Sequence, residues 1–204
     1  MKNKLKKYEG LIFDMDGTLI DTMPAHLLAW EMTASHFNFP YSASWIHGLG
    51  GMPSNKIVME VNAKYDLALD AAMVSRYKMD AFSSLEDHGG IIGCTSDIFS
   101  EFCGKKKIAV GTGSQRVNAE RLLDRFNFLE KLDALVTASD VNNHKPHPDT
   151  FAQAAAIMGL TNKQCVVFED TELGKQAAHA AGMDCIMVVD GQLEFWPLDE
   201  KEPL

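Results

Sequence analysis

One segment constrains the fold more than any other part of the chain: Leu11-Ile12-Phe13-Asp14-Met15-Asp16-Gly17-Thr18. Three apolar residues lead directly into an acid, a second acid follows two positions later, and a Gly-Thr turn ends the segment. A buried strand of this kind places Asp14 and Asp16 where a parallel sheet opens to solvent, the usual ligand crevice of such sheets. Acids so close together repel each other, which predicts a bound cation or a shared proton. The segment also fits a strand followed by an ordinary Asp-Gly turn, and by itself it does not decide between the two.

Apolar runs and amphipathic stretches alternate along much of the remaining chain. Five strands are expected, at 8–14, 108–112, 134–137, 166–170 and 185–189. Helices are expected between the later strands, at 95–102, 116–126, 148–158 and 173–181. Alternation of this kind predicts an α/β fold with a Rossmann-like parallel sheet and right-handed crossovers. The segment from Gly191 to Leu204 is predicted to contain no regular element.

Between Asp21 and about Leu85 the pattern indicates helices and no strand. Apolar residues recur at helical spacing in 24–37, from 53 or 54 to about 61, and in 70–82, with a glycine-rich loop at 47–52. We therefore predict a small helical domain at residues 22–85, inserted into an α/β core domain formed by residues 1–21 and 86–204.

The composition limits the partners of the protein. Its 204 residues include 28 acids and 19 lysines and arginines, a net charge of −9, which argues against nucleic acid as a partner. No 18-residue apolar run and no signal-peptide core occur, and the four cysteines form no CxxC pair. These features predict a cytoplasmic protein that does not enter membranes, expected to be a monomer or a weak dimer.

Three later segments carry polar groups at or just after expected strand ends. They are Thr112-Gly113-Ser114, the loop that contains Lys145, and Glu169-Asp170. Because parallel strands point their carboxyl ends at one edge, these groups are expected to converge on Asp14 and Asp16. Clustered carboxylates suit Mg²⁺, hydroxyl and amide groups can hold phosphate oxygens, and a lysine supplies a point charge for a phosphoryl group.

Each of these segments also has an ordinary structural explanation. Thr112 fits a helix N-cap, Lys145 fits a solvated loop, and the acids at 169–170 fit the first turn of the following helix. The coincidence of all of them at one sheet edge favours a functional site.

In this order, Asp14-Met15-Asp16-Gly17-Thr18, Thr112, Lys145-Pro146 and Glu169-Asp170 resemble the four motifs of the haloacid-dehalogenase-like phosphohydrolases. The helical insertion resembles the small cap of the beta-phosphoglucomutase-like branch of that family. The resemblance extends over nearly the whole chain up to about Val189.

The resemblance implies roles for the motif residues. Asp14 would be the nucleophile that forms an aspartyl-phosphate, and Asp16 would protonate the leaving oxygen and then activate water. Asp14, the backbone carbonyl of Asp16, Asp170 and Glu169 would hold Mg²⁺, with Glu169 acting directly or through another ligand. We expect the neighbouring charge of Asp14 to raise the pKa of Asp16 unless a bound metal ion outweighs it.

Further implied roles concern substrate binding. Thr112, Gly113, Ser114 and Lys145 would bind the transferring phosphoryl group. Gly51 lies in the cap loop where this branch places its specificity loop, although a plain flexible turn explains that loop equally well. His26 matches a histidine that is frequent in the first cap helix, but a lone histidine is more often structural. Closure of the cap over substrate is expected to exclude water.

The implied function is a Mg²⁺-dependent phosphatase that acts on small phosphosugars, of the type of fructose-1-phosphatase and related sugar phosphatases. One alternative is a beta-phosphoglucomutase, an isomerase, and another is a catalytically silent phosphate-binding protein. The mutases carry a lysine after the second motif and an arginine in the cap loop. Here these positions hold Gln115 and Ser54, and Lys56 is the nearest cation.

Overall fold

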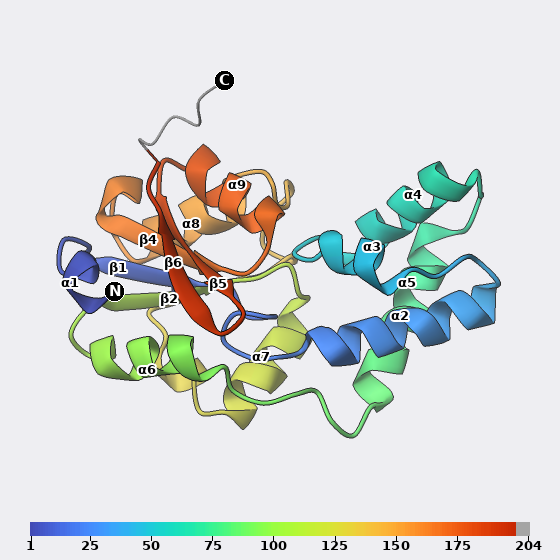
Figure 1. Cartoon of the computed structure of the whole chain (residues 1–204), viewed down its shortest axis with the longest axis horizontal. Coiled ribbons are helices and arrows are strands. Elements are labelled where there is room, and N and C mark those ends of the chain that lie inside the picture. The colour runs from blue at the N-terminus through green and yellow to red at the C-terminus, as the bar shows by residue number, and fades with distance from the viewer. Residues whose placement is uncertain (199–204) are drawn as a thin grey trace.

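The computed structural model describes residues 1–198 and has a six-stranded sheet with helices on both faces and a helical bundle at one end (Figure 1). The strands are β1 Gly10–Phe13, β2 Lys107–Gly111, β3 Ala134–Val136, β4 Cys165–Glu169, β5 Asp184–Val189 and β6 Gln192–Trp196. Their order across the sheet is β3-β2-β1-β4-β5-β6, and only β6 runs antiparallel to its neighbour. The predicted α/β class with a parallel sheet is confirmed.

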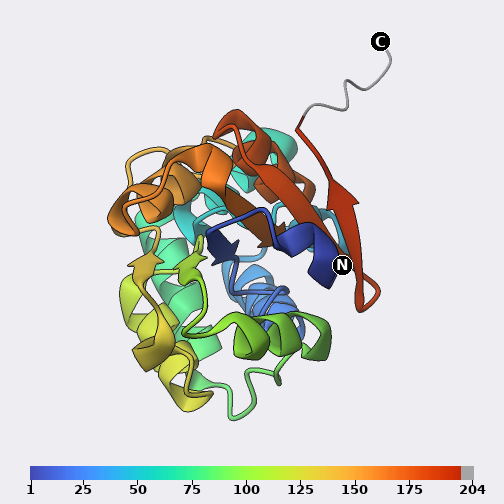
Figure 2. The same ribbon diagram turned by 90° about the vertical axis from the view of Figure 1, so that its left-hand side faces the viewer.

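Alternation of side chains along β1 builds two apolar layers. Leu11 and Phe13 belong to one buried cluster, which also contains residues of α6 and α7, and Ile12 belongs to the other, which contains residues of α8 and α9. The core helices are α1 Lys2–Leu5, α6 Gly93–Phe102, α7 Arg116–Arg125, α8 Asp149–Ile157 and α9 Glu172–Ala180. Figure 2 shows these helices on the two sides of the sheet.

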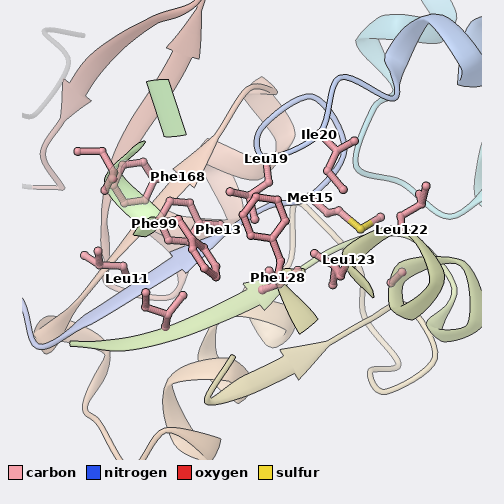
Figure 3. Packing of buried hydrophobic residues seen from close by; sticks show 14 of the residues in the cluster. Leu11, Phe13, Met15, Leu19, Ile20, Phe99, Leu122, Leu123, Phe128 and Phe168 are labelled. Carbon is pink, nitrogen blue, oxygen red and sulfur yellow. The ribbon is translucent and has the colours of Figure 1, made fainter. Parts of the chain in front are cut away.

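Aromatic rings pack together at the end of β1, immediately before Asp14 (Figure 3). The ring of Phe13 stacks on that of Phe168 at a centroid distance of 4.5 Å and tilts against Phe99 at 5.7 Å. All three side chains are fully or almost fully buried. Contacts of this density give the end of β1 a rigid support.

The helical insertion forms a bundle with an apolar core of its own. Its helices are α2 Met23–Phe37, α3 Ala43–Gly48, α4 Ser54–Tyr65 and α5 Ala71–Ser84. Trp30, Val58 and Val74 are buried in that core. Two antiparallel linkers join the bundle to the sheet domain, where the Asp21 amide donates to the Gly90 carbonyl at 2.8 Å. The boundaries predicted for the cap, 22 and 85, each lie one residue outside α2 and α5.

The prediction that no regular element follows Gly191 is wrong for the described part of that segment. Asp190 and Gly191, both with positive φ, turn the chain into β6, which pairs with β5. Leu193 and Phe195 alternate with exposed residues and pack on the first apolar cluster. The Asp-Gly pair before alternating residues is a recognised hairpin signal. Residues 199–204 lie outside the described part of the chain.

The short helices α1 and α3 were also not predicted, because each is too brief for helical periodicity to be visible. Within residues 1–198, no helix is both long enough and apolar enough to cross a bilayer.

Candidate active site

The central position of β1 brings the polar strand ends together. β1 pairs with β2 on one side and with β4 on the other. Asp14 directly follows β1, Thr112 directly follows β2, and Glu169 is the last residue of β4. The Asp14 amide donates to the Phe168 carbonyl at 2.9 Å. The pairing of the sheet therefore places Asp14 beside the end of β4, where Glu169 lies.

A buried lysine joins two of these acids. The Nζ of Lys145 lies 2.5 Å from Oδ1 of Asp14 and 2.6 Å from Oε1 of Glu169, and all three side chains are at most 5% exposed. Burial alone would lower the pKa of Lys145, but the two carboxylates reverse this and raise it above its ordinary value. The site therefore contains a permanent cation beside Asp14.

Glu169 orients this lysine. Its second oxygen, Oε2, accepts hydrogen bonds from the amides of Asp170 and Thr171, at 2.9 and 2.7 Å, and from the Thr171 hydroxyl at 2.9 Å. Gly174, in the first turn of α9, packs against the carboxylate so closely that no Cβ would fit there. Both oxygens of Glu169 are thus occupied by protein donors.

Asp16 is held by four donors. Its Oδ1 accepts from the Thr22 hydroxyl at 2.6 Å and lies 3.2 Å from Nε2 of His26. Its Oδ2 accepts from the hydroxyls of Thr112 and Ser114, at 3.2 and 2.7 Å.

These donors determine the ionisation of Asp16. Burial favours the neutral acid, but the hydrogen bonds from His26, Thr22 and Ser114 outweigh it and hold the pKa of Asp16 below its ordinary value. The prediction that Asp14 raises this pKa is therefore wrong. Hydrogen bonds from two segments, the start of α2 and the loop after β2, decide the direction, and the sequence spacing of the two acids does not reveal them.

A second buried lysine, Lys78 of α5, completes this network from the cap. Its Nζ lies 2.6 Å from Nδ1 of His26. Because an ammonium can only donate, Nδ1 must accept, and the proton of a neutral His26 must lie on Nε2, which then donates to Asp16. Burial and Lys78 lower the pKa of His26, and burial lowers the pKa of Lys78 to about 8.

Lys78 is the site residue that sequence reasoning missed. It lies on the buried stripe of α5, together with Val74, Ala81 and Phe82. A lysine on an otherwise apolar helical stripe is the available signal, because buried lysines are rare unless they have a partner.

Asp14 and Asp170 form the part of the site that fits a divalent cation. Burial and Glu169 raise the pKa of Asp170 to about 7, and burial together with the nearby acids raises the pKa of Asp14 despite Lys145. A cation would relieve this cost of ionisation. No group of three or more acid, histidine or cysteine side chains within residues 1–198 is arranged to hold a metal. Two carboxylates completed by a backbone oxygen, phosphate and water suit Mg²⁺.

A cavity between the cap and the sheet opens onto Asp14 and Asp16. From the core it is lined by Asp14, Asp16, Gly113, Ser114 and Gln115. From the cap it is lined by Met23, His26, Leu27, Trp30, Ile46, Gly50, Gly51, Met52, Ser54, Ile57, Ser75, Lys78 and Met79. Thr112 lies behind this wall, 1% exposed. Lys56 lines a different cavity, beside His144 and His147.

Comparisons with known proteins agree with this geometry. The sequence model of the family described as haloacid dehalogenase-like hydrolase matches residues 11–188. The chain is 39% identical over 183 residues to fructose-1-phosphate phosphatase YqaB of Escherichia coli strain K12, covering 90% of this chain and 97% of that protein. It is 28% identical to the beta-phosphoglucomutase of Bacillus subtilis strain 168, covering 90% and 84% of the two chains.

A solved structure shares the fold. The beta-phosphoglucomutase of Clostridium difficile superposes with a TM-score of 0.81 at 23% identity, over 90% of this chain and 85% of that one. At this identity the likeness concerns the fold alone.

We predict that Lys78 fixes the tautomer of His26. In the wild type, the ¹⁵N shift of Nδ1 should be that of an unprotonated acceptor and the shift of Nε2 that of a protonated nitrogen. Lys78→Met should produce a mixture of tautomers, because Nδ1 loses its donor. The matched control is Lys64→Met, at an exposed lysine of α4. An unchanged tautomer in Lys78→Met would contradict the assignment.

Proposed function

The chain belongs to the haloacid dehalogenase-like hydrolases, and we propose that it is a Mg²⁺-dependent phosphatase that hydrolyses small phosphosugars through an aspartyl-phosphate on Asp14. The observation that carries this proposal is the Asp14 carboxylate, held at the end of β1 by Lys145 and facing the cavity beside a hydrogen-bonded Asp16. The similarity to a fructose-1-phosphate phosphatase supports the choice of substrate class.

In the first step, a carboxylate oxygen of Asp14 attacks phosphorus and the ester bond to the sugar oxygen breaks. Lys145 remains within reach of the transferring group, and Ser114 and the amides of its loop offer further donors. The leaving sugar oxygen takes a proton from Asp16.

Asp16 must acquire that proton on substrate binding, because its pKa is low in the unliganded protein. A phosphate dianion beside the carboxylate raises its pKa, and so does loss of the Ser114 hydroxyl to a phosphate oxygen. In the second step, water gives a proton to Asp16 and attacks phosphorus. The phosphorus–oxygen bond to Asp14 then breaks, which releases phosphate and restores both acids.

The residues that would hold Mg²⁺ are Asp14, Asp170 and the backbone carbonyl of Asp16. The ion supplies positive charge that neutralises the phosphoryl oxygens. The remaining acid, Glu169, acts by holding Lys145 and the start of α9.

The cavity favours a leaving group without a second phosphate. Among the described residues that line it, Lys78 is the only lysine or arginine, and His26 already accepts from it. Gln115 is neutral, and its Oε1 accepts from the Ser139 hydroxyl at 2.9 Å, which leaves the amide hydrogens for a substrate hydroxyl. Losing two charged hydrogen bonds to a second phosphate, at roughly 1.5–3 kcal/mol each, weakens bisphosphate binding by about a hundredfold or more.

We therefore predict hydrolysis in preference to isomerisation. Fructose 1-phosphate and other sugar monophosphates should release inorganic phosphate, because water reaches the intermediate before a bisphosphate can reorient. β-Glucose 1-phosphate should not be converted efficiently to glucose 6-phosphate, even with a bisphosphate primer. A panel assay for phosphate, run beside a coupled glucose 6-phosphate assay, measures both reactions.

Two results of this assay would contradict the proposal. Isomerisation faster than phosphate release would make the protein a mutase. Absence of phosphate release from every sugar and aryl phosphate, at the level of an Asp14→Asn control, would favour a silent phosphate-binding protein.

We also predict dependence on Mg²⁺ through Asp170. Chelation should abolish turnover, Mg²⁺ should restore it, and Mg²⁺ should raise the thermal unfolding midpoint because it binds the folded state. Asp170→Asn should lose most of the midpoint shift, and Asp97→Asn, at an exposed acid of α6, should keep it. Turnover insensitive to chelation, or an equal shift in both variants, would show that the acids do not bind Mg²⁺.

A further inference from the structure

Two glycines meet where the cap touches the sheet domain. Gly113 lies in the loop after β2, and Gly51 lies in the cap loop between α3 and α4. A Cβ added to Gly113 would lie 2.9 Å from the carbonyl carbon and 3.4 Å from the Cα of Gly51, and closer still to the carbonyl oxygen. These are backbone atoms, so no rotation of a side chain can relieve the overlap.

The conformation of Gly113 does not itself require glycine. Seven other glycines of the described chain have positive φ, including Gly51 at 85°, but Gly113 does not. Within its own domain the loop would therefore accept an alanine. The close approach of the cap is the feature that excludes a side chain at this position.

The same cap loop touches two other core segments. A Cβ on Gly51 would lie 3.2 Å from Cδ of Lys145, and one on Gly50 would lie 3.1 Å from Cγ2 of Thr171. The loop therefore rests on the segments that follow β2 and β4 and on the loop that carries Lys145. These segments carry Thr112, Ser114, Lys145 and Asp170, which surround the two acids that follow β1.

We propose that Gly113 is a positioning residue, which by lacking a side chain lets the cap loop seat on the sheet domain. Gly113 lies between Thr112 and Ser114, whose hydroxyls both donate to Asp16. Seating the cap brings His26 to the other oxygen of Asp16 and closes the cavity over Asp14. A methyl group at position 113 holds the cap away and separates His26 and Lys78 from the acid that they position.

The substrate dependence of the defect distinguishes this role from a general structural one. A sugar alkoxide needs a proton from Asp16 as it leaves, and so it depends on the orientation that the contact with His26 gives to the Asp16 carboxyl group. Nitrophenolate is a stable anion and needs no such proton. This arm of the test rests on the proposed function, whereas amide exchange of the cap loop requires no turnover.

The experiment compares Gly113→Ala with Gly48→Ala, whose added Cβ would meet no atom within 4 Å. For Gly113→Ala we expect kcat/KM on fructose 1-phosphate to fall roughly 10- to 100-fold, and that on p-nitrophenyl phosphate to fall less than about threefold. Amides 49–52 should exchange faster in Gly113→Ala only, and its thermal unfolding midpoint should match that of Gly48→Ala.

Three outcomes would overturn the proposal: equal losses on both substrates, identical behaviour of the two variants, or a Gly113→Ala protein that fails to fold or unfolds earlier than the control. Equal losses on both substrates, or an unstable protein, would mean that the sheet domain itself requires this glycine. Identical behaviour of the two variants would mean that this position does not require glycine. If the wild type releases no phosphate from any sugar phosphate, the proposed function fails, and amide exchange alone decides the role of Gly113.

Discussion

The buried ion pairs of Lys145 with Asp14 and Glu169 are the interaction on which the site depends. Removing one partner from such a group leaves an uncompensated buried charge, a loss of about 3–5 kcal/mol. The three residues come from two neighbouring strand ends and one long loop, so the pairs also fix how these segments lie. The charge balance still leaves an excess of acids around Asp14 and Asp170, which is the physical reason to expect a divalent cation there.

The cap acts on another acid of the site, Asp16. The sheet positions Asp16, but its ionisation depends on His26, which is in turn oriented by Lys78. The cap loop meets the sheet domain at Gly113, Lys145 and Thr171, and at Gly113 the backbone of Gly51 lies too close to admit a methyl group. The acids on the sheet domain and the part of the cavity wall that the cap forms are thus linked through a few short contacts.

Much of the fold and part of the site could be predicted from the sequence. Parallel strands must end at one edge, so acids after β1 and β4 were expected to meet, and Asp14 and Glu169 do meet through Lys145. The features that were missed depend on contacts distant in sequence. Lys78 meets His26 across 52 residues, and the low pKa of Asp16 reflects donors from two segments, the start of α2 and the loop after β2. The strand β6 is the exception, because its Asp-Gly turn and its alternating apolar residues are local signals that the sequence does display.

The central claim is that Asp14 becomes covalently phosphorylated during turnover. Acid quenching within the first turnover of fructose 1-phosphate, followed by mass spectrometry of the peptide that contains Asp14, tests it most directly. We predict a phosphorylated Asp14 in the wild type, and neither modification nor turnover in Asp14→Asn. Sustained phosphate release by Asp14→Asn, or a phosphoryl group found on another residue, would contradict the account.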